Sequence, residues 1–66
     1  MKVTANGVSY NVVIAHAVAE FRNSAGESRK TVFATNLETR KLHEYSTYEN
    51  LVTEDDIRDF LETRTT

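Results

Sequence analysis

This 66-residue sequence contains no cysteine, only two glycines and no long apolar run. Without cysteine the chain can form neither a disulfide nor a thiolate metal site. Two glycines are too few for a glycine-rich phosphate-binding loop. The longest apolar run, residues 12–15, is far shorter than a membrane span. A folded chain of this size must therefore draw its stability from packing, from a partner protein or from self-association.

The sequence also has few residues suited to catalysis or metal binding. His16 and His43 are its only histidines, and the nearest carboxylates that could join them on a metal are Glu20 and Glu44. A strand would send the side chains of the adjacent pair His43 and Glu44 to opposite faces. There is no thiol, no GxSxG motif, and the serines fall in predicted turns or next to them. We expect a protein that is not an enzyme and that uses no cofactor and no metal.

The first seven residues have no apolar core followed by a small-residue cleavage site. We therefore expect a cytoplasmic protein. The length corresponds to a single domain over residues 1–66, with a tail at residues 63–66 that frays.

Asn6-Gly7 is the strongest hairpin pattern in the chain, because a type I′ turn needs positive φ at both central residues. It predicts strands over residues 2–5 and 8–13. In the second strand the apolar residues Val8, Tyr10, Val12 and Ile14 alternate with other residues. The apolar positions then shift by one residue, and we expect a β-bulge at that point.

Residues 11–25 also fit a helix, with Asn11 as its cap and apolar residues at helical spacing as far as Phe21. The turn-rich residues 23–27, flanked by charged residues, favour a hairpin and therefore a strand. Further strands are predicted at residues 31–35 and 40–45, joined by a turn over residues 36–39. The last strand is polar enough to lie at a sheet edge.

The clearest element is a C-terminal helix that begins after Thr53. Thr53 is a good N-cap, and Asp56, three residues later, completes a capping box. Val52 and Ile57 match a hydrophobic staple across the cap. The pattern of a capping box recurs at residues 46–49 and predicts a short helical turn there.

The apolar residues Ile57, Phe60 and Leu61 form one stripe along the predicted helix. The whole pattern predicts an α+β fold, in which a meander of about four antiparallel strands carries one C-terminal helix on the sheet.

Charge is divided unevenly along the chain. Residues 1–45 carry six basic and four acidic residues, a net charge of +2, whereas residues 46–66 carry two basic and six acidic residues, a net charge of −4. The acidic residues expected to line the outside of the predicted helix are Glu54, Asp55, Asp59 and Glu62. They fit an ordinary solvated helix face, and they also fit a surface that docks on a basic patch of another protein.

We therefore predict a protein-binding module that docks on a larger partner through this acidic helix or through a sheet edge. Small accessory subunits and phage-type inhibitors have this size and this lack of catalytic residues, an analogy of class only.

Two other hypotheses stay open. The chain could bind nucleic acid through the basic residues around its predicted hairpin ends, supported by aromatic side chains that stack on bases. The basic residues are Arg22, Arg29, Lys30, Arg40 and Lys41, and the aromatic ones are Tyr10, Phe21, Phe33 and Tyr45. Alternatively, two copies could pair through their sheet edges to form a homodimer.

Overall fold

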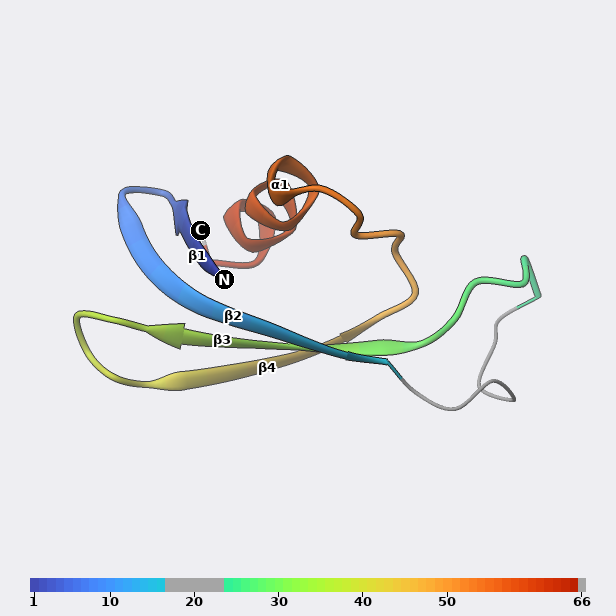
Figure 1. Ribbon diagram of the computed structural model, residues 1–66, viewed down its shortest axis with the longest axis horizontal. Helices are drawn as coiled ribbons and strands as arrows, with labels where there is room; N and C mark the ends of the chain where they lie inside the picture. Colours follow the sequence, from blue (N-terminus) through green and yellow to red (C-terminus); the bar gives the residue numbers. More distant parts are fainter. Residues whose placement is uncertain (17–23, 66) are drawn as a thin grey trace.

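The computed structural model describes residues 1–16 and 24–65. These residues form four antiparallel strands and one helix (Figure 1). The elements in chain order are β1 (Lys2–Ala5), β2 (Val8–His16), β3 (Lys30–Asn36), β4 (Leu42–Thr47) and α1 (Glu54–Arg64). The strands are neighbours in the order β1-β2-β3-β4, and α1 lies across one face of the sheet, against β1. This arrangement confirms the predicted α+β meander.

The first hairpin turns at Asn6-Gly7, as predicted, with φ values of 52° and 77°. Strand β2 is longer than predicted, and its pairing with β3 continues in register to His16↔Lys30. Residues 11–16 are therefore strand and not helix. Because the register is unbroken, no bulge follows Ile14 in the described part of β2. The rest of the shifted apolar pattern, residues 17–23, lies outside the described residues.

The second predicted turn, at residues 36–39, is also present. The Asn36 side-chain oxygen accepts hydrogen bonds from the backbone N–H groups of Glu38, at 2.8 Å, and Thr39, at 3.1 Å. Arg40 then takes a positive φ of 62° and returns the chain towards β4. Strand β4 lies at the sheet edge, as predicted. The prediction of a helical turn at residues 46–49 is wrong, because residues 46 and 47 pair with β3.

The core lies between α1 and the face of the sheet that it covers. Its buried members are Val3, Ala5, Tyr10, Val12, Val32, Ala34, Ile57, Phe60 and Leu61. The predicted staple is not formed, because Val52 is 72% exposed. Leu51 packs against the core instead. In the described ranges 1–16 and 24–65, no helix has both the length and the apolar character needed to cross a membrane.

Candidate functional site

Helix α1 starts at the predicted capping box. The Thr53 hydroxyl accepts a hydrogen bond from the backbone N–H of Asp56, at 3.2 Å. The Asp56 carboxylate in turn accepts from the backbone N–H groups of Thr53, at 3.0 Å, and Val52, at 3.1 Å. The bond from Thr53, followed by that from Val52, lowers the pKa of Asp56 below its ordinary value. The Asp56 carboxylate is therefore already engaged in hydrogen bonds with backbone N–H groups at the start of the helix.

The predicted apolar stripe of α1 faces the sheet, with Ile57, Phe60 and Leu61 all buried. On a helix with 100° per residue, Asp55, Asp59 and Glu62 fall together on the opposite side. We call these three residues the acidic stripe. Asp55 and Asp59 are exposed, and Glu62 is half-buried. Glu54, the fourth predicted residue, is exposed but lies about 100° round the helix from Asp55.

One residue of the acidic stripe has a cationic partner on the same helix. The Arg58 guanidinium donates to the Asp55 carboxylate at 2.6 Å, and both side chains are more than a third exposed. Such a surface ion pair stabilises the fold by about 0–1 kcal/mol, so Asp55 can exchange Arg58 for another cationic group at little cost. No ion pair within the described part of the chain involves Glu54, Asp59 or Glu62. Their negative charge is therefore available to a partner.

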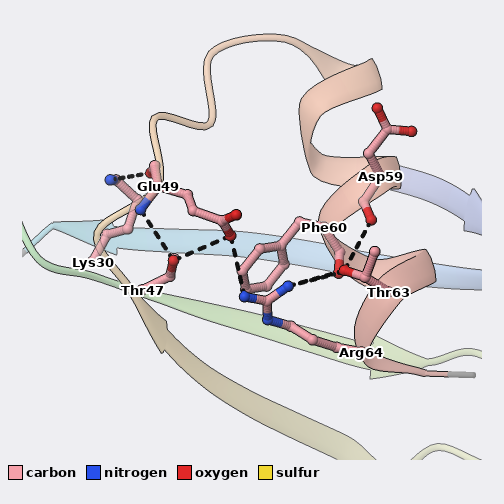
Figure 2. A network of polar contacts seen from close by, with 7 residues as sticks. All are labelled: Lys30, Thr47, Glu49, Asp59, Phe60, Thr63 and Arg64. Carbon is pink, nitrogen blue, oxygen red and sulfur yellow. Dashed lines mark hydrogen bonds and ion pairs between the residues drawn. The ribbon is translucent and has the colours of Figure 1, made fainter.

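A shallow hollow of about 250 Å³ lies beside the acidic stripe, between α1 and residues 49–51. Leu51 and Phe60 are among the residues that line it, together with the three acidic residues Glu49, Asp56 and Asp59, so the hollow combines apolar surface with three carboxylates. Figure 2 shows Asp59 beside Phe60 and Thr63. The Asp59 backbone carbonyl accepts a hydrogen bond from the Thr63 hydroxyl, at 3.2 Å. The Asp59 carboxylate itself points away from this contact.

No family model, curated protein or solved structure matches the chain. The acidic stripe and its hollow are distinguished by charge, exposure and shape alone.

A set of contacts that sequence reasoning missed holds the segment after β4 against the helix (Figure 2). The Arg64 guanidinium carbon lies 3.7 Å from the centre of the Phe60 ring, and the same group donates to the Glu49 carboxylate at 3.2 Å. The hydroxyl of the buried Thr47 accepts a hydrogen bond from the backbone N–H of Glu49 and donates one to the Glu49 carboxylate. Glu49 and Arg64 are 15 residues apart, so no local pattern pointed to this contact.

Lys30 belongs to this network and not to a basic surface. It is only 6% exposed, and its ammonium group donates to the backbone carbonyls of Ser28 and Glu49. A buried ammonium group with these partners cannot reach a phosphate unless the local structure opens. The prediction of Lys30 as a nucleic-acid contact is therefore corrected.

The other predicted basic residues do not gather at one place. Arg29 is exposed and donates to the Ser46 hydroxyl at 3.4 Å. Arg40 and Lys41 follow the other end of β3, so a seven-residue strand, about 20 Å long, separates them from Arg29. Arg22 lies outside the described residues.

The aromatic residues are likewise divided between different surroundings. Tyr10 is buried in the core, and Tyr45 packs edge-on against the Phe60 ring at 5.8 Å. Phe33 belongs to the alternate positions of β3 that face away from α1. The predicted stacking platform is therefore not assembled by these three residues, and Phe21 lies outside the described residues.

The two histidines are also far apart. His43 lies between the rings of Tyr10 and Tyr45, at 6.4 Å from each, while His16 is exposed at the end of β2. Among residues 1–16 and 24–65, no group of three or more His, Asp or Glu side chains could hold a metal ion.

Proposed function

We propose that this chain is a protein-binding module, not an enzyme, that docks on a larger partner through the acidic stripe. The partner surface would be basic. The chain would act as a small accessory subunit, or as an inhibitor that covers a functional surface of another protein. The observation that carries the proposal is Asp59, which is exposed, has no ion pair among the described residues and borders the hollow that Leu51 and Phe60 also line.

The physical argument combines charge and shape. Carboxylates at i, i+4 and i+7 on one helix side form a line of negative charge that speeds the approach of a basic surface. The hollow next to Asp59 offers Leu51 and Phe60 to the aliphatic stem of a lysine or arginine. A basic side chain could thus bury its stem in the hollow and place its charged head on Asp59.

The test compares two reversals of charge at exposed acidic residues. Asp59→Lys alters the acidic stripe, and Glu38→Lys makes the same change of charge in the β3–β4 turn, outside the stripe. Both variants have the same net charge, so any general effect of charge is matched. We expect a partner captured by the parent from nuclease-treated cell lysate to be retained by Glu38→Lys and lost by Asp59→Lys. Purified with that partner, Asp59→Lys should associate more slowly and depend less on salt.

Equal capture by both variants would contradict docking through the stripe. Binding that disappears on nuclease treatment, and that is abolished by Arg29→Glu, would instead favour the nucleic-acid hypothesis, because phosphate contacts dominate such binding. Arg29→Glu is tested alone, since Lys30 is buried and its replacement would disturb the fold.

A further inference from the structure

The face of the sheet opposite α1 is not covered by any element in the described residues (Figure 1). We call it the open face. Three of its side chains are apolar: Val13 and Leu42 are each 55% exposed, and Phe33 is half-buried. The polar residues Asn11 and Thr35 lie on the same face. Alternation along the strands also places Lys2 and Glu44 on this face, because their strand neighbours Val3 and Tyr45 belong to or pack against the core.

Strand register fixes where these residues lie. Val13 is opposite Phe33, which is opposite Glu44, so the three form one row across β2, β3 and β4. Lys2 begins the adjacent row on β1, and Leu42 ends it on β4. The open face therefore has one apolar pair, Val13 and Phe33, on its two central strands, a positive charge at its β1 edge and a negative charge at its β4 edge.

We propose that two copies of this chain associate through their open faces, about a two-fold axis that runs parallel to the strands. Such an axis places the β1 edge of each copy over the β4 edge of the other, and the two strands overlap at the row that contains Lys2 and Leu42. The Val13–Phe33 pair of one copy then meets the same pair of the second copy in reverse order. Lys2 of each copy comes close to Glu44 of the other, and because a two-fold interface repeats every contact, this ion pair forms twice.

The charges disfavour a two-fold arrangement of the same faces in which the axis runs across the strands. An axis that runs across the strands would place β4 on β4 and β1 on β1. The two Glu44 side chains would then lie close together, as would the two Lys2 side chains, and like charges across an interface are unfavourable. The opposite edges of the open face are thus complementary when the axis runs parallel to the strands and not when it runs across them.

The size of the open face sets the strength of the association. Strands β2, β3 and β4, about 4.8 Å apart over a paired length of about 20 Å, give roughly 300 Å² per copy, and the four-residue β1 adds less than about 100 Å². Stable protein pairs bury about 800 Å² per partner. We therefore expect a weak dimer, which forms at high protein concentration and leaves the acidic stripe exposed on the outer sides.

The first experiment measures mass against concentration by sedimentation equilibrium, from about 10 μM to about 1 mM, a range that covers weak association. We expect the average mass of the parent to rise towards that of a dimer. Val13→Lys should weaken the dimer at least about tenfold, because it places a charge at the centre of the interface in both copies. Val52→Lys is the matched control, since Val52 is exposed beside α1 and away from the open face. It should associate like the parent.

The second experiment tests the arrangement through the two charges, both at exposed positions. Lys2→Glu or Glu44→Lys alone should weaken the dimer about threefold to tenfold, because each replaces an ion pair by like charges. The double variant Lys2→Glu with Glu44→Lys keeps the net charge of the parent and should restore association to within about twofold.

Several results would overturn the proposal. A parent that stays monomeric over the whole range contradicts it, and so does a dimer that Val13→Lys leaves unchanged, which would point to pairing through sheet edges. Failure of the double charge variant to recover association would refute the axis parallel to the strands. Circular dichroism of each variant verifies that the fold is intact before the masses are compared.

Discussion

Replacing Phe60 with alanine is the sharpest test of how α1 is held on the sheet. The Phe60 side chain is 4% exposed, with the Tyr45 ring edge-on at 5.8 Å and the Arg64 guanidinium 3.7 Å from its centre. Removal of a buried phenylalanine ring costs about 3–5 kcal/mol. Stability of roughly 0.05–0.15 kcal/mol per residue gives this chain about 3–10 kcal/mol in total. Phe60→Ala should therefore remove between a third of the folding free energy and all of it.

The assay is urea unfolding, followed by far-ultraviolet circular dichroism. With a slope of about 1 kcal/mol per molar urea for a small protein, the loss corresponds to a midpoint several molar lower, or to a variant unfolded in buffer. Phe60→Leu is the matched control: it keeps apolar volume and loses the ring contacts, so we expect a cost below about 1.5 kcal/mol. If Phe60→Ala unfolds at the same urea concentration as the parent, the packing of α1 on the sheet is refuted.

Other substitutions test single contacts, each by urea unfolding. Thr53→Ala removes the helix cap and should cost about 1 kcal/mol. Because hydrogen bonds from Thr53 and Val52 lower the pKa of Asp56, its ionised form stabilises the fold above pH of about 4, and this contribution is lost as the pH falls through the lowered value. Asp56→Asn should therefore make stability less dependent on pH in that acidic range, and an unchanged acid profile would contradict the capping role. Gly7→Val should destabilise the first hairpin through its φ of +77° alone, because nothing lies within 4 Å of the added Cβ; an unaffected hairpin in amide exchange would contradict this. Lys30→Met leaves two carbonyls without their donor and should cost about 1–3 kcal/mol, whereas Arg29→Met, at an exposed neighbour, should change stability by less than about 0.5 kcal/mol; equal effects would refute the structural role of Lys30.

Most of the fold could be predicted from the sequence, because its decisive patterns are local. The Asn6-Gly7 turn depends on two adjacent residues that tolerate positive φ. The start of α1 depends on Thr53 and Asp56, three residues apart, and its buried side depends on the spacing of apolar residues. The acidic stripe follows from the same helical spacing, and so three of the four acidic residues predicted to bind a partner share one side of α1.

The tertiary structure alone decided which charged and apolar residues were available at the surface. Lys30 looked like a surface base in the sequence, but carbonyls 2 and 19 residues away bury its ammonium group. Leu51 and not Val52 packs beside the cap, because the path of the chain after β4 sets which side chain meets the core. Arg29 and Arg40 lie at opposite ends of β3 because an antiparallel meander places successive turns at opposite ends of the sheet. Local geometry is set by neighbours in the sequence, whereas burial depends on residues that only the folded chain brings together.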